Sequence, residues 1–113
     1  MPYIATKVNV KISKEQESNL VKKFGKAIEI IPGKDESNLM LSFEHDCALY
    51  FRGTNEQAIA MVEVKCFGKA SNEAYDELTD TLTDILYQEL DIEPRNTFVK
   101  YDELAHWGKH HYD

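Results

Sequence analysis

MPYIATKVNV, residues 1–10, is the stretch around which the rest of the chain is organised. From Tyr3 to Val10 it is rich in β-branched residues, and apolar and polar side chains alternate along part of it. This composition and alternation are typical of a strand. We therefore expect the first strand of a sheet to begin at the very start of the chain.

Pro2 gives the same stretch a chemical property. If Met1 is removed, Pro2 becomes a secondary amine at the chain terminus. An α-amino group titrates at about 7.7–8.0 in model peptides, and burial or a nearby cation lowers its pKa. A neutral amine at working pH can act as a general base. The simpler interpretation is that the strand merely begins after a common Met-Pro start.

A helix and a second strand follow. Ser13 and Gln16 have the spacing of a capping box, and Pro32-Gly33 ends the helix because glycine adopts the left-handed conformation at little cost. Asn38 to Glu44 alternates as a strand, so residues 2–44 predict a βαβ unit. The apolar stripe of the helix is Leu20, Val21, Phe24, Ala27, Ile28 and Ile31.

A second unit follows at residues 58–101. Ile59 to Phe67 is the longest strand candidate, and Ala60, Val62, Val64 and Cys66 share one of its faces. Ser71 or Asn72 is expected to cap the next helix, Pro94 to end it, and Thr97 to Tyr101 to form the last main strand. The tail, residues 102–113, shows no periodicity.

Two such units predict an α/β fold (α+β in some schemes) in a single domain, residues 1–113. Right-handed crossovers give a four-stranded mixed sheet with both helices on one face. The other face would carry Ile59, Met61, Glu63, Lys65 and Phe67. Since this face is half apolar, we expect it to be buried against other subunits.

The composition argues against several classes of protein. With 13 Lys+Arg and 20 Asp+Glu, the net charge of −7 suits nucleic-acid binding poorly. No stretch approaches the ~20 apolar residues of a membrane span, and we expect no secretory signal, because residues 1–10 lack a basic patch followed by an apolar run. Cys47 and Cys66 form neither a Cys-x-x-Cys nor a zinc pattern. We expect both thiols to be reduced in a cytoplasmic protein, with non-classical secretion left open.

Several short motifs together resemble the macrophage migration inhibitory factor family of the tautomerase superfamily. Their order and spacing cover the chain to about Gly108. The resemblance implies a homotrimer with active sites between neighbouring subunits. It also implies keto–enol tautomerisation of phenylpyruvate-like 2-keto acids by the terminal proline, without cofactor or metal. The motifs are Met1-Pro2, Gly33-Lys34, Phe67-Gly68-Lys69, Phe98-Val99-Lys100-Tyr101 and Trp107-Gly108.

The resemblance also assigns roles to residues. Pro2 would be the catalytic base, Lys34 would hold a substrate carboxylate, and Phe67 would offer its backbone N–H. Simpler structural explanations exist for three of the residues. Lys34 could be a helix-end cation, which is favoured by about 0.3–1 kcal/mol. Phe67 could be a core residue, and Lys100, where the resemblance allows a second cation, could be a solvated strand residue. The expected substrate-binding residues are Lys34, Phe67, Tyr3, Phe98, Lys100 and Trp107.

The chain also departs from the family pattern. Phe98 stands where the best-known members carry tyrosine, Lys100 where they carry asparagine, and Lys109 where they carry an aromatic residue. Ile59 and Val62 align with the family's Cys-x-x-Cys, so thiol-redox activity at that motif has no residues to act through.

Other functions stay open at this point. The main alternative is a cytokine-like signalling or binding protein with a vestigial tautomerase site. Hydratase or dehalogenase chemistry ranks last, because Arg52 and Arg95 do not fall at the matching places. A metal site on His106, His110 and His111 with Asp113 is disfavoured, because the tail lacks helical periodicity and a fuller ligand pattern.

Overall fold

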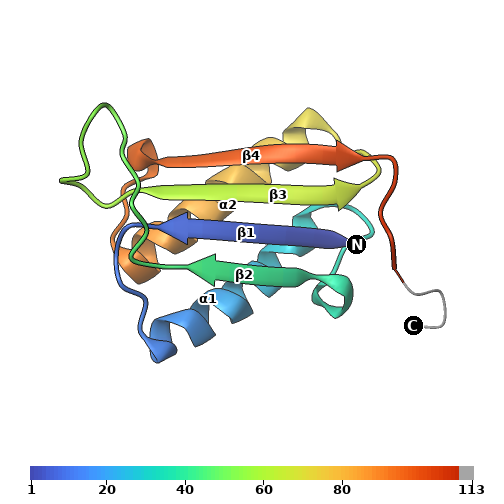
Figure 1. The fold of residues 1–113 in the computed structure, drawn as a ribbon. Helices are drawn as coiled ribbons and strands as arrows, with labels where there is room; N and C mark the ends of the chain where they lie inside the picture. Colours follow the sequence, from blue (N-terminus) through green and yellow to red (C-terminus); the bar gives the residue numbers. More distant parts are fainter. Residues whose placement is uncertain (110–113) are drawn as a thin grey trace.

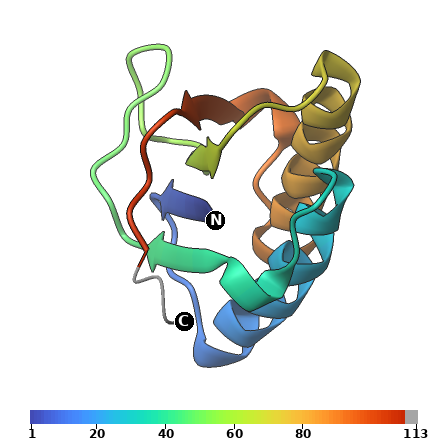
Figure 2. The ribbon, with the colours of Figure 1, turned by 90° about the vertical axis from the view of Figure 1, so that its right-hand side faces the viewer.

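The computed structural model describes residues 1–109. Its sheet has the strand order β2-β1-β3-β4, and both helices pack on one face of it (Figures 1 and 2). The first strand pairs in parallel with the second and antiparallel with the third, which pairs in parallel with the fourth. The elements are β1 (Pro2–Val8), α1 (Lys14–Ala27), β2 (Met40–Glu44), β3 (Ala60–Phe67), α2 (Asn72–Leu90) and β4 (Thr97–Leu104). The predicted mixed sheet with two helices on one face is confirmed.

The helix starts follow the predicted capping chemistry. Ser13 Oγ accepts a hydrogen bond from the Gln16 N–H at 3.1 Å, and the Gln16 side chain accepts from the Ser13 N–H at 2.9 Å. Ser71 caps α2 by accepting from the Ala74 N–H. These bonds satisfy N–H groups that have no partner within the helix.

The end of α2 differs from the prediction. The helix ends at Leu90, because Asp91 adopts the left-handed conformation with φ 57° and its N–H bonds back to Tyr87. Pro94 begins a later 3-10 turn, η3 (Pro94–Asn96), and does not end the helix. Two further 3-10 turns are η1 (Ile28–Ile30) and η2 (Glu36–Asn38).

The core lies between the sheet and the helices. The predicted face of β3 is buried, since Val62 and Val64 are at most 1% exposed. From the helices, Leu20, Phe24 and Leu82 pack against this layer. β4 is longer than predicted, because its parallel pairing with β3 continues to Leu104.

The opposite face of the sheet is charged at its centre. Lys65 pairs with Glu63 at 3.2 Å and Asp102 at 3.3 Å, and Lys100 pairs with Asp102 at 3.4 Å. Ile59, expected on this face, is buried within the chain, and its N–H donates to Asn9 Oδ1 at 2.7 Å. The expected mixed face is therefore confirmed at its centre, where Glu63 and Lys65 lie, and is wrong at Ile59, which is buried within the chain.

The exposed apolar side chains of this face lie near its edges and ends. Met40 of β2 is 68% exposed, Phe98 of β4 is 59% exposed, and Phe67 ends β3 at 51%. The segment between β2 and β3 is a loop with one bridge between Phe51 and Thr54. The Phe51 ring packs edge-on against Phe98 at 5.1 Å between centroids.

No helix within residues 1–109 is long and apolar enough to cross a membrane. Cys47 and Cys66 are both free thiols, the first partly exposed and the second buried in β3.

Candidate active site

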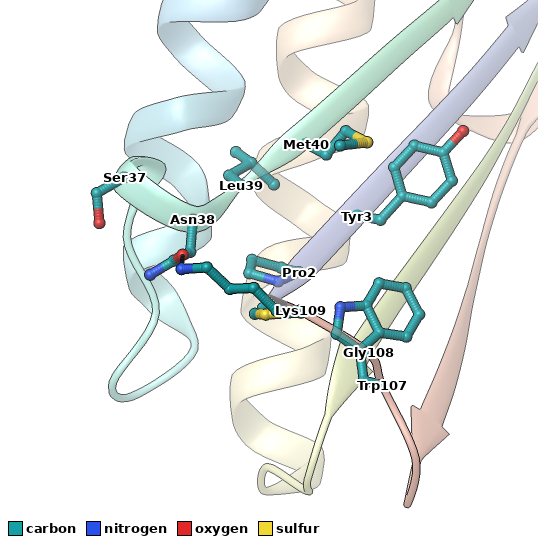
Figure 3. A pocket seen from close by; sticks show the side chains of 10 residues that line it. Pro2, Tyr3, Ser37, Asn38, Leu39, Met40, Trp107, Gly108 and Lys109 are labelled. Atoms are coloured by element: carbon teal, nitrogen blue, oxygen red, sulfur yellow. Dashed lines mark hydrogen bonds between the residues drawn. The ribbon is translucent and has the colours of Figure 1, made fainter. Parts of the chain in front are cut away.

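A pocket of about 570 Å³ opens at the end of the sheet where β1 begins (Figure 3). Three segments far apart in sequence build it: the chain terminus, the turn leading into β2, and the tail after β4. The tail reaches the pocket by crossing from β4 to the β2 side of the sheet (Figures 1 and 2). The lining residues are Met1, Pro2, Tyr3, Ser37, Asn38, Leu39, Met40, Trp107, Gly108 and Lys109.

Pro2 occupies a buried position at the head of β1, between β2 and β3. Its partner across the antiparallel ladder is Cys66. Proline has no N–H to donate, so the first residue of a strand is one of the few places in a sheet where it fits. The sheet itself therefore holds the Pro2 nitrogen at the pocket.

Lys34 lies beside the same strand ends. Gly33, with φ 82°, turns the chain after α1, and the Lys34 side chain reaches β3, where Nζ donates to the Phe67 carbonyl at 3.1 Å. The alternative of a helix-end cation fits this position less well, because the dipole acts within the last turn, and α1 with the η1 turn that follows it ends at Ile30, four residues before Lys34.

Burial and nearby charges shift the pKa of the terminal amine. The pKa of the Met1 amino group lies below its ordinary value of 8.0, first because burial disfavours the charged form and next because of the Lys34 ammonium. Lys109 lowers this pKa further, and Cys66 opposes the shift. The pocket thus disfavours a protonated amine at the start of the chain.

Aromatic rings form one side of the pocket. Figure 3 shows the rings of Tyr3 and Trp107 on one side of Pro2, with Asn38 on the other. The Tyr3 hydroxyl is 2.8 Å from Ser42 Oγ on the neighbouring strand, which fixes the ring over the sheet. Both residues were expected at the site, and the structure places both at the pocket.

Phe98 and Lys100 do not join this pocket within one chain. Phe98 pairs with Met61, five residues along β3 from Cys66, which is about 17 Å at the usual strand rise. Phe98 packs on Phe51, and Lys100 forms ion pairs on the open face of the sheet.

The residues before β2 were not predicted at the site, and Lys109 was noted only as a departure from the family pattern. The turn of Ser37 and Asn38 comes next to Pro2 because β2 pairs in parallel with β1, so a predicted register would have found it. Lys109 Nζ donates to Asn38 Oδ1 at 2.5 Å. The two residues are 71 positions apart, so no local sequence pattern predicts this contact.

A hydrogen-bonded tyrosine supports the β3 end of the site. Tyr75 accepts from the Ala70 N–H at 3.2 Å and donates to Glu103 at 2.6 Å, which ties the turn after Phe67 to α2 and β4. Burial and then the Glu103 carboxylate raise the pKa of Tyr75 to about 12. The hydroxyl therefore remains a donor across the physiological range.

Within residues 1–109, no group of three His, Cys, Asp or Glu side chains gathers as metal ligands would. Of the histidines considered for a metal, His106 is described, whereas His110 and His111, together with Asp113, lie outside the described residues.

Solved structures with the same fold define the class of protein. Leishmania major MIF2 is similar to the chain with a TM-score of 0.89 and 24% identity, over 96% of this chain and 93% of that one. A macrophage migration inhibitory factor homologue from Prochlorococcus marinus gives 0.85 and 23%, over 96% and 95%. A protein called Pt0534, crystallised after inactivation by 2-oxo-3-pentynoate, gives 0.80 and 16%, over 95% and 91%. The chain has the tautomerase-superfamily fold.

The sequence profile described as "Macrophage migration inhibitory factor (MIF)" matches residues 1–110. The chain belongs to the macrophage migration inhibitory factor family. None of the curated proteins compared with it matches it in sequence.

Proposed function

We propose that this protein is a keto–enol tautomerase acting on phenylpyruvate-like 2-keto acids, with Pro2 as general base once Met1 is removed. The observation that carries the proposal is the terminal amine in the pocket, whose pKa burial and Lys34 both lower. Removal of one residue transfers the free amine to Pro2, which is buried at the same end of the sheet. A neutral secondary amine at that position can accept a proton at neutral pH.

In the proposed reaction, the Pro2 nitrogen takes a proton from the carbon next to the ketone. The electrons of the broken C–H bond form the C=C bond of the enol, and the proton is returned at the carbonyl oxygen. Lys34 would bind the carboxylate by a charge-assisted hydrogen bond. The Phe67 N–H would assist at the carboxylate or the developing enolate, while Tyr3 and Trp107 exclude water from the amine.

Phe98 and Lys100 enter the proposal through a neighbouring subunit. Exposed apolar side chains lie at opposite edges of the sheet, Met40 beside the Pro2 pocket and Phe98 far from it. If the β2 edge of one subunit contacts the β4 edge of the next, the interface is heterologous. Heterologous interfaces close into a ring when the rotation from one subunit to the next adds up to a full turn. A homotrimer built this way would bring Phe98 and Lys100 of one subunit to the pocket of the next. We place the reaction in the cytoplasm, where both free thiols stay reduced.

The test is enol formation from phenylpyruvate by protein whose intact mass shows Met1 removed. Turnover that is saturable and abolished by acetylating the amine supports the proposal. No turnover by correctly processed, folded protein contradicts it and leaves the binding-protein alternative. Light scattering should give about three times the 13.0 kDa chain mass, and a monomer would contradict the shared site.

A further inference from the structure

Lys109 is a second cation at the Pro2 pocket. The tail after β4 carries it across the strand ends, and in Figure 3 its side chain extends toward Asn38. Its Nζ donates to Asn38 Oδ1 at 2.5 Å. Asn38 lies two residues before Met40, which is paired with Tyr3, so this ammonium sits on the β2 side of Pro2.

Lys34 sits on the other side. Its Nζ contacts the carbonyl oxygen of Phe67 at the end of β3. Because β1 lies between β2 and β3, the two ammonium groups are about two strand spacings apart, or roughly 10 Å. Pro2 lies between them.

Both cations are held by neutral oxygens. No carboxylate within residues 1–109 forms an ion pair with Lys34 or Lys109. Lys65 and Lys100 show the contrast, since each pairs with Glu63 and Asp102. In a chain of net charge −7, Lys109 in the pocket lining and Lys34 beside the adjoining end of β3 are two unneutralised cations that make a local site for negative charge.

We propose that the pocket selects short 2-keto acids that carry a second carboxylate, with Lys34 binding one carboxylate and Lys109 the other. The proposal rests on the proposed tautomerase function and names the substrate class for it. Each ammonium–carboxylate contact adds about 3 Å, so a short dicarboxylate spans cations roughly 10 Å apart. A monoanionic aromatic acid uses the Trp107 side of the pocket but leaves Lys109 without an anionic partner.

The chain's single tryptophan gives a readout that needs no turnover. Trp107 lines the pocket, so quenching of its fluorescence reports occupancy. The probes are succinate and butyrate, which share a carbon chain of the same length and differ in the second carboxylate. Lys109→Met keeps the apolar stem and removes the charge, and Lys22→Met removes a charge from an exposed position of α1 as the control.

We expect succinate to bind more tightly than butyrate, and Lys109→Met to weaken succinate about fivefold, as loss of one partly exposed ion pair does. Butyrate binding should stay within about twofold in the same variant. Lys109→Arg should keep the preference for succinate, and Lys22→Met should change neither ligand. Equal affinities of the two ligands for wild-type protein, or equal weakening of both by Lys109→Met, would overturn the proposal.

Kinetics separate this inference from the function on which it rests. If phenylpyruvate is turned over but succinate binds no more tightly than butyrate and does not compete, the tautomerase function is supported and the dicarboxylate site is contradicted. If no keto acid is turned over but succinate binding depends on Lys109, the tautomerase fails and the pocket is an anion-binding site. Turnover of a 2-keto dicarboxylic acid with a KM that rises in Lys109→Met at nearly constant kcat supports both.

Discussion

Lys34→Met tests the electrostatics of the proposed site. In the structure, Lys34 Nζ donates to the Phe67 carbonyl at 3.1 Å, and Lys34 is partly buried. A hydrogen bond to a charged group contributes about 1.5–3 kcal/mol. Because solvent reaches Lys34, we take the lower end, which corresponds to about a tenfold loss in affinity for the carboxylate. The variant should therefore raise KM for phenylpyruvate about tenfold and lower kcat less, as loss of a uniform binding contact does.

The same substitution should move the pH profile. The Lys34 ammonium is, after burial, the next cause of the lowered pKa of the terminal amine. A cation disfavours the protonated amine, so its removal lets the pKa rise toward 8.0. The acid limb of kcat/KM should then shift to higher pH, because a higher pH is needed to free the base.

Steady-state kinetics on phenylpyruvate over a series of pH values measure both effects, with Lys22→Met as the control for loss of one charge. Urea denaturation should show a change within about 0.5 kcal/mol, since a partly exposed contact is lost. A kcat/KM within about twofold of wild type together with an unmoved acid limb would refute the role given to Lys34.

Three further predictions concern the fold and assembly. Thr6→Val should raise stability by about 1 kcal/mol in urea denaturation, because the Thr6 hydroxyl is buried with no hydrogen-bond partner among residues 1–109; a loss of about 1 kcal/mol would contradict this. The pKa of Tyr75 is about 12 in the folded chain against an ordinary value of 10.0, so the free energy of unfolding should fall as pH rises from the lower value to the higher. The fall should be smaller in Tyr75→Phe, and the same pH dependence in both proteins would contradict this. Phe98→Ser should lower the mass seen by light scattering from three times 13.0 kDa toward that of one chain; an unchanged trimer would show that Phe98 is dispensable for assembly.

The parts of the fold that depend on local periodicity could be predicted from the sequence. The alternation of β3 set which side chains are buried, and Ser13 with Gln16 set the start of α1. The end of α2 could not be located, since Asp91 adopts a left-handed conformation that many residue types adopt only at a cost. Nor could the burial of Ile59 be predicted, because its surroundings include Asn9, fifty positions away, which accepts a hydrogen bond from the Ile59 N–H.

The candidate site was predictable to a lesser degree. Pro2, Tyr3 and Trp107 do lie together at one pocket, as the resemblance implied. Phe98 lies toward the far end of the sheet and Lys100 near its middle, because the β3–β4 register is set by pairing along the whole strand and not by their own motif. Lys109 and Asn38 lie in two irregular segments, and their contact could not be predicted because it depends on no periodic pattern in the sequence.

The most direct test of the account compares one protein in two forms, with Met1 removed and with Met1 retained, each verified by intact mass and circular dichroism. If the Pro2 amine is the base, the processed form should turn over phenylpyruvate with an acid limb below the ordinary amine pKa of 8.0. The retained form carries an amide nitrogen at Pro2, so its kcat should be lower by about 10²–10⁴-fold, as for loss of a general base. Equal rates from the two forms would show that the Pro2 amine is not the base.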